Sequence, residues 1–174
     1  MKYNSNEAIA ILERTPLVLK SLLNGLENEW VTCNEGPETF SPYDVLGHLI
    51  HAEKTDWVVR AKHVLALGAT QPFDPFDRFA HYEASKGKSL QHLLGEFETM
   101  RRENIDWLES LNLSEADLEK KGVHPALGEV TLRNLLATWV VHDLSHIAQV
   151  TRVMAKQYKT EVGPWVEYLR ILNN

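Results

Sequence analysis

The sequence contains one cysteine, nine glycines and seven prolines among its 174 residues. The single cysteine, Cys33, excludes an intramolecular disulfide framework and fits a reducing compartment such as the cytoplasm. No catalytic motif surrounds Cys33, so we expect its thiol to be inert. The scarcity of glycine and proline leaves few tight turns. This disfavours a β-sandwich or a β-barrel, because those folds need a turn about every ten residues.

Clustered positive charge and long apolar runs are also missing. The chain has 18 lysines and arginines against 24 aspartates and glutamates, which gives a formal net charge of −6. Nucleic-acid binding relies on clustered cations, but the basic doublets Arg101-Arg102 and Lys120-Lys121 have acidic neighbours. No stretch approaches the roughly 20 apolar residues of a membrane span, and the first residues do not resemble a signal peptide. We therefore expect a cytoplasmic protein that binds neither nucleic acid nor a membrane.

Helical periodicity of the apolar residues is the main structural signal, and no segment shows a convincing strand alternation. The periodic segments are approximately residues 5–31, 41–67, 89–111, 131–158 and 164–172. Pro16 should kink or split the first segment, because proline lacks a backbone donor. Residues 71–79 and 122–128 are expected to be structured loops. Four long helices and one short one predict an all-α four-helix bundle in a single domain, residues 1–174.

Two histidines in the fourth long helix are the first candidates for chemistry. His142 and His146 lie four residues apart, so they project from one face of the helix, one turn apart. The other residues on this stripe, which is about 80° wide, are Leu135, Trp139, Gln149 and Val153. Burying two imidazoles is costly unless their nitrogens have partners. The pair is therefore either a hydrogen-bonded core pair or two ligands of one metal ion.

A third ligand would have to come from another helix, and the second long helix offers His48. The residues that share its face, which we expect to point inward, are Val45, Ala52, Thr55 and Val59. His51 and His63 lie about 60° to either side of His48 and are the alternatives. His48 is preferred because it lies at the centre of the stripe, where the small Ala52 leaves room for an ion.

Other polar residues are less informative. Asp56 is about 80° around the helix from His48, and Gln149 lies on the stripe of His142. Either could act as a catalytic base, but a hydrogen bond at the rim or support for a ligand is an equal alternative. The histidines that we expect on the surface or in loops are His63, His81, His92 and His124.

Two segments resemble a known family. Residues 41–49 (SPYDVLGHL) resemble the first block of the DinB/YfiT-like superfamily. Residues 124–132 (HPALGEVTL), which run on to residues 142–149 (HDLSHIAQ), resemble the second. The order and separation of the blocks agree, as does the helical layout over nearly the whole chain. The resemblance implies a four-helix bundle with the order up-down-down-up. It also implies a metal held by three histidines, here His48, His142 and His146.

Three neutral imidazoles would leave one coordination position of the ion open, as in catalytic zinc sites. Zn or Ni is the expected ion, and Fe or Mn would also fit. We expect a metal-dependent enzyme that acts on a small molecule, either a hydrolase or a thiol-dependent S-transferase. The resemblance implies low-molecular-weight thiols such as bacillithiol or mycothiol as partners. The alternative is a non-catalytic bundle with a stress-response or binding role, in which the metal only fastens two helices.

A second apolar stripe occupies the side of the second helix opposite His48. Its members, which fall within about 40° of one another, are Leu46, Ile50, Trp57 and Val64. Such a stripe must pack either on other helices of the monomer or on a partner subunit. The first alternative needs no partner, and the second predicts a homodimer.

Overall fold

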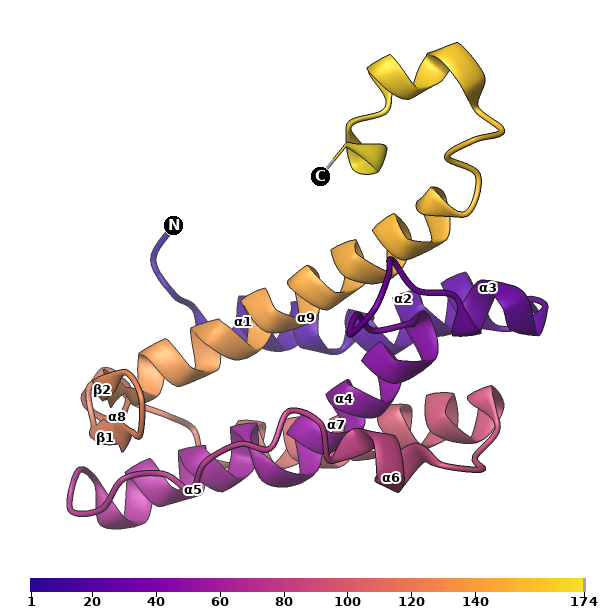
Figure 1. Ribbon diagram of the computed structural model, residues 1–174. Coiled ribbons are helices and arrows are strands. Elements are labelled where there is room, and N and C mark those ends of the chain that lie inside the picture. The colour runs from indigo at the N-terminus through magenta and orange to yellow at the C-terminus, as the bar shows by residue number, and fades with distance from the viewer. Residues whose placement is uncertain (174) are drawn as a thin grey trace.

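The computed structural model describes residues 1–173, and most of them are helical (Figure 1). The helices are α1 (Ser5–Leu12), α2 (Arg14–Leu23), α3 (Asn28–Thr32), α4 (Pro42–Thr55), α5 (Trp57–Leu67), α6 (His81–Ser85), α7 (Leu90–Ser110), α8 (Glu115–Leu118) and α9 (Leu132–Lys156). A hairpin, β1 (Lys121–His124) and β2 (Gly128–Thr131), precedes α9, and two 3-10 helices, η1 (Gly163–Tyr168) and η2 (Arg170–Leu172), follow it.

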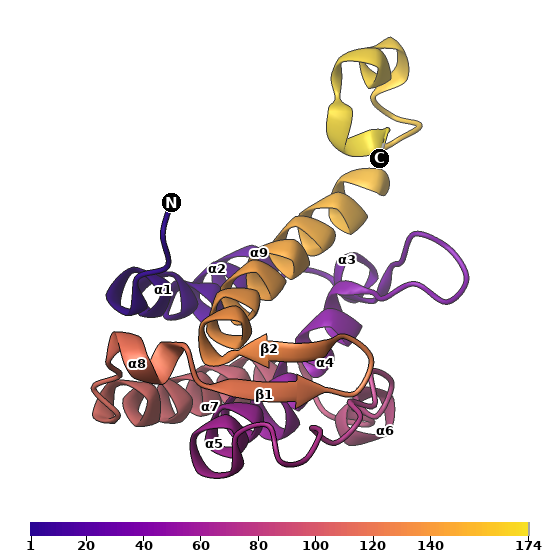
Figure 2. The ribbon, with the colours of Figure 1, turned by 90° about the vertical axis from the view of Figure 1, so that its left-hand side faces the viewer.

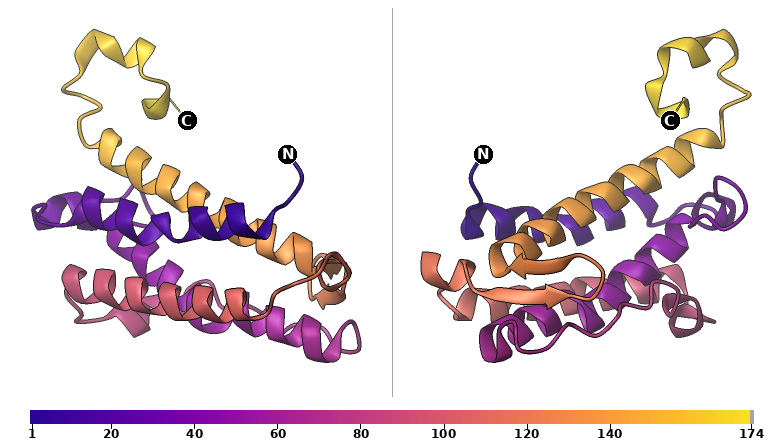
Figure 3. Two further views of the ribbon diagram at one scale, coloured as in Figure 1. Left: turned by 180° about the vertical axis from the view of Figure 1, so that it is seen from behind. Right: turned by 60° about the vertical axis from the view of Figure 1, so that its left-hand side comes forward.

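Four long runs of helix form the bundle: α1–α2, α4–α5, α7 and α9. Figures 1 and 3 show α1–α2 and α9 running in one direction and α4–α5 and α7 in the other. The all-α fold and its up-down-down-up order are therefore confirmed.

The sequence determines where the two helices that carry the candidate ligands begin. Ser41 and Asp44 form a reciprocal capping box at the start of α4, with Pro42 in the first turn. Thr131 and Asn134 form the same arrangement at the start of α9. These caps satisfy backbone donors that have no partner within the helix. They thereby fix the turn on which each histidine lies.

The first predicted helix, residues 5–31, is divided into α1, α2 and α3, and Pro16 explains the first break. Proline has no N–H to donate to the carbonyl four residues earlier, which belongs to Leu12. That carbonyl instead accepts a hydrogen bond from Nη1 of Arg101, at 2.7 Å. The second break follows Leu23, where Gly25 adopts a positive φ of 80°.

The second predicted helix, residues 41–67, is also interrupted, at Asp56 between α4 and α5. The break changes which residues of α5 face the core, and Val59 is 48% exposed. Thr55, the last residue of α4, is also exposed. The expectation that both point inward with His48 is therefore wrong. Val45 and Ala52, which precede the break, are buried as predicted.

The hairpin lies where the sequence predicts a loop over residues 122–128. Its strands pair antiparallel, with Val123 opposite Glu129 (Figure 2). Gly122 allows the chain to approach Phe73, because a Cβ at this position would lie 2.6 Å from the Phe73 ring. The backbone N–H of Phe73 also donates to the carbonyl of Val123, at 2.8 Å. Strands of four residues are too short for their alternation to be recognised in the sequence.

The second apolar stripe packs inside the monomer. Leu46, Ile50, Trp57 and Val64 are all buried, none more than 4% exposed. This stripe therefore gives no support to a homodimer, which stays a prediction. In the part of the chain that the structure describes, no helix is both long and apolar enough to cross a membrane.

Beyond α9 the chain leaves the bundle. The predicted last helix, residues 164–172, is instead the two 3-10 helices η1 and η2 (Figures 1 and 3). Leu172 is buried, whereas Trp165 and Tyr168 are exposed. This segment forms one end of the molecule and does not contribute to the candidate site.

Candidate metal site

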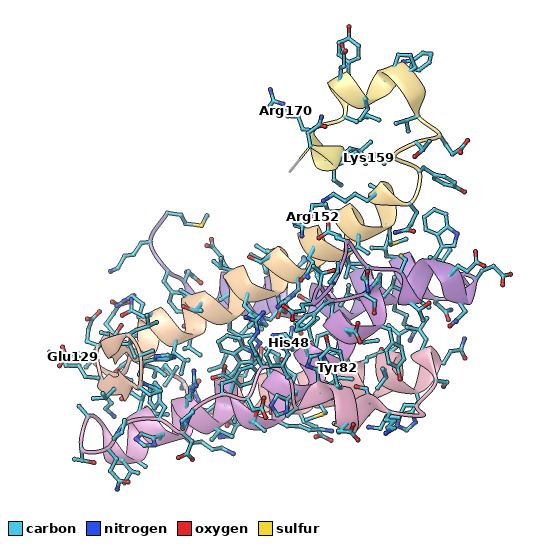
Figure 4. The ribbon with its side chains drawn as sticks, viewed as in Figure 1. His48, Tyr82, Glu129, Arg152, Lys159 and Arg170 are labelled. Carbon is cyan, nitrogen blue, oxygen red and sulfur yellow. The ribbon has the colours of Figure 1, made fainter. Side chains whose placement is uncertain are left out.

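His48, on α4, faces His142 and His146, on α9, across the bundle. Nε2 of His48 lies 3.2 Å from Nε2 of His142, which in turn lies 3.1 Å from Nε2 of His146. Figure 4 shows His48 between the two helices. The structure therefore brings together the three histidines that the sequence singles out, although they are far apart in the chain.

The spacing of these nitrogens suits one small cation. Two nitrogens that each lie about 2.0–2.1 Å from a tetrahedral zinc ion are about 3.3 Å apart. The three rings offer one nitrogen each, all within 4.8 Å of one another. Among the residues that the structure describes, this cluster contains no cysteine or carboxylate. The donor set therefore fits an ion with three protein ligands.

Burial keeps two of these imidazoles neutral. Removal from water, and next the neighbouring imidazoles, lower the pKa of His48 to about 3. The same causes lower the pKa of His146 to about 4. A neutral ring is the form that binds a metal. His48 is buried, but His142 and His146 are partly exposed, so the cluster can be reached from solvent.

The hydrogen bonds of the Nδ1 atoms determine whether the Nε2 lone pairs are directed into the cluster. Nδ1 of His146 lies 2.8 Å from Oε1 of Gln149. Because the amide oxygen accepts, Nδ1 carries the proton and the lone pair of Nε2 is directed into the cluster. Gln149 thus has the ligand-supporting position that the sequence offers as an alternative to a base. Nδ1 of His142 is buried 3.9 Å from Oδ1 of Asp143, and neither atom has a hydrogen-bond partner among the residues that the structure describes.

Comparison with known proteins shows the family of this chain. The family model of the DinB superfamily matches residues 11–150. The chain belongs to the DinB superfamily.

Its fold also matches a solved structure, that of YfiT from Bacillus subtilis. The two share 21% sequence identity, and the match covers 90% of this chain and 94% of that chain with a TM-score of 0.76. YfiT is described as a probable metal-dependent hydrolase with an unusual four-helix bundle topology. At this identity the likeness establishes the fold of the present DinB superfamily protein. No curated protein matches its sequence.

Behind His142, this DinB superfamily protein has a fully buried network of charged groups. Arg101 of α7 donates through Nη1 to Asp143, at 2.6 Å, and through Nη2 to Glu53, at 2.7 Å. Asn104 and Trp139 also donate to Glu53, at 2.8 and 3.2 Å. Burial alone would lower the pKa of Arg101, but the two carboxylates raise it above its usual range. The sequence signal for this network is an arginine at helical spacing between Phe97 and Ile105, which our sequence interpretation did not use.

His81 corrects another expectation, since it is fully buried rather than on the surface. It lies on α6, which packs against α4 at Gly47, where a Cβ would come 3.4 Å from the His81 ring. The His81 and His48 rings are 5.6 Å apart, and Nδ1 of His81 lies 3.0 Å from the carbonyl of Arg78. His81 is therefore a wall of the site. The packing of α6 on α4 is a tertiary contact that periodicity does not reveal.

The other histidines lie outside the cluster. The His51 ring is tilted against Phe76, with ring centroids 5.0 Å apart, and Nε2 of His63 lies 3.0 Å from the carbonyl of Gln71. Neither replaces His48. His92 is exposed, as predicted, and His124 is partly exposed in the hairpin.

Proposed function

We propose that this chain is a metal-dependent enzyme that acts on a small molecule, with His48, His142 and His146 as the ligands of one divalent ion. The observation that carries the proposal is the cluster of three Nε2 atoms, with neighbouring pairs 3.1 and 3.2 Å apart. Three protein ligands with one position left open are characteristic of catalytic zinc, whereas structural zinc has four protein ligands. Zn and Ni are the ions that we expect first, with Fe and Mn as alternatives.

The surroundings of the cluster support catalysis rather than a purely structural role. A divalent ion in this site would supply a Lewis acid that activates water or a thiol. The protein positions the rings: Gln149 holds His146, and the Trp57 ring packs edge-on against His142 with centroids 5.0 Å apart. Phe76 packs against His48 in the same way, at 5.6 Å. Apolar walls on one side and partly exposed ligands on the other leave an approach for a small substrate.

Hydrolysis and S-transfer are the two reactions that fit this proposal. Both use one open coordination position, for water in the first and for a thiolate in the second. The low-molecular-weight thiol, like the cytoplasmic location, stays a prediction from the sequence. A bundle in which the ion only ties α4 to α9 would have no turnover with either reagent.

The experiment is an activity screen of the metal-loaded protein beside its His146→Ala variant. One arm offers small esters and amides in water, and the other offers small thiols together with electrophiles. We expect turnover in one arm, which is lost on chelation and restored by adding the metal back. Metal binding without turnover in either arm would favour the non-catalytic alternative.

A further inference from the structure

A cleft lies on the hairpin side of the histidine cluster, and none of the three candidate ligands is among its lining residues. It has a volume of about 180 Å³ and lies between α5, the β1–β2 hairpin and the first turns of α9, which Figure 2 shows together. Trp57 lines it and contacts the His142 ring, and Thr138 lines it one turn before His142. Since a water-sized group needs about 30 Å³, the cleft has room for about six non-hydrogen atoms.

Most of the cleft wall is apolar. Trp57, Phe73 and Leu135 are buried side chains that line it, and Leu127 lies exposed at the hairpin turn. Such walls favour a ligand with hydrocarbon surface, and the few polar groups then set its orientation.

Asp56 is the first of these polar groups. Its side chain lies at the break between α4 and α5 and is buried, with the residue only 7% exposed. Nε of Arg60 lies 2.9 Å from Oδ1 of Asp56. Oδ1 is sealed from solvent and faces the Arg60 guanidinium, whereas the side chain as a whole remains 10% exposed. Among the residues that the structure describes, none donates a hydrogen bond to Oδ2, so this oxygen is the acceptor left for a ligand that brings an N–H or an O–H.

His124 is the second polar group. Its Nδ1 accepts hydrogen bonds from the backbone N–H groups of Ala126 and Leu127, at 3.1 and 3.2 Å. The neutral ring therefore carries its proton on Nε2, which makes this nitrogen a donor. Asp56 and His124 thus offer the cleft an acceptor and a donor.

We propose that this cleft binds a small uncharged carboxamide. The N–H of the amide matches Asp56, its carbonyl oxygen matches His124, and its alkyl part matches the apolar walls. The Asp56 carboxylate disfavours an anion, and Arg60 disfavours a cation. The inference rests on the proposed function in making an amide the substrate class of the metal site. Binding itself uses no metal ligand, so it can be tested separately.

The test is a titration of ¹⁵N-labelled protein with butyramide, followed through the indole N–H signal of Trp57. That signal is assigned by its loss in a Trp57→Phe variant. We expect a saturable shift with butyramide and binding at least about tenfold weaker for butyrate and for butylammonium. The absence of a saturable shift, or tighter binding of either charged probe, would overturn the proposal.

Two pairs of variants localise the binding. Asp56→Asn should weaken butyramide binding at least about tenfold, while Asp106→Asn, on the exposed side of α7, should not. Thr138→Phe should fill the cleft and abolish binding. Ser145→Phe is its control, because Ser145 is also exposed on α9 and its hydroxyl also bonds the carbonyl four residues earlier. Unchanged binding in Asp56→Asn and Thr138→Phe would place the amide elsewhere and refute the inference.

The His146→Ala variant separates the two proposals. It should lose the metal but bind butyramide as the wild type does. Loss of butyramide binding in a folded His146→Ala protein would mean that the amide binds the ligands themselves, which contradicts the cleft. If the wild type binds butyramide but takes up no metal, the proposed function is refuted and the proposed binding cleft is retained.

Discussion

Arg101 and Asp143 form an ion pair that is almost completely removed from solvent. Nη1 lies 2.6 Å from Oδ2, and the two side chains are 2% and 0% exposed. Such a pair is stable only where further hydrogen bonds compensate for the lost water, and here Glu53 and the Leu12 carbonyl provide them. Because Asp143 directly follows His142, the ion pair also fixes the turn of α9 that carries a candidate ligand.

Replacing Arg101 by methionine should lower the free energy of unfolding by about 3–5 kcal/mol, since it leaves two buried carboxylates without a counter-charge. Urea denaturation of the metal-free protein measures this. Lys20→Met is the control, because Lys20 pairs with Glu98 on the surface, where such pairs contribute about 0–1 kcal/mol. Equal effects of the two substitutions would contradict the stabilising role of the network.

Removing one predicted ligand should remove the metal. We expect wild type to retain one divalent ion per chain after dialysis, and His146→Ala to retain little. His63→Ala is the matched control, because His63 lies outside the cluster, against the Gln71 carbonyl and the Phe73 ring. Elemental analysis gives the answer directly. If wild type and His146→Ala hold equal amounts of metal, the site is wrong.

Gln149→Ala should weaken metal binding without removing a ligand. The amide of Gln149 orients His146 at 2.8 Å, and losing a partner of this kind costs about 10- to 100-fold in affinity. Competition with a chelator measures the change. Gln91→Ala, which removes an exposed amide bonded to Asn24, should leave the affinity as in wild type. An unchanged affinity in Gln149→Ala would show that ring orientation does not depend on this hydrogen bond.

Acid should destabilise the metal-free protein through the histidine cluster. The folded-state pKa values of His48 and His146 are about 3 and about 4, against about 6.5 in an unfolded chain. Between these values the unfolded chain binds protons that the folded chain does not. The free energy of unfolding therefore falls as the pH decreases from about 6.5 toward about 4. Urea denaturation across this range should show a smaller loss in a His48→Gln, His146→Gln variant, and an equal loss would count against this origin.

Metal affinity should also fall on acidification, because protons compete for the same nitrogens. The lowered pKa values of His48 and His146 move this loss below about pH 6.5, the value for an unperturbed imidazole. Chelator competition at about pH 7 and about pH 5 measures it. Release already complete above about pH 6.5 would contradict the environment described for these rings.

Much of the fold and the candidate ligands could be predicted from the sequence, because helices are specified by residues that are close together in the chain. Helical periodicity places His142 and His146 on one stripe, and capping residues such as Ser41 set the start of α4. Contacts between distant segments were not predictable in this way. The burial of His81 depends on α6 packing against α4. The interruption at Asp56 turns the residues that follow it to a different side, so that Val59 no longer shares the inward face of His48.

Arg101 also affects how the protein unfolds locally. Its guanidinium holds the carbonyl that Pro16 leaves free at the end of α1, together with Glu53 of α4 and Asp143 of α9, while its own backbone belongs to α7. If any one of these helices unfolds locally around these contacts, the Arg101 guanidinium loses a partner and buried charge on the other helices is exposed to solvent. Amide hydrogens near Leu12, Glu53, Arg101 and Asp143 should accordingly exchange with solvent at one common rate, as a single cooperative unit.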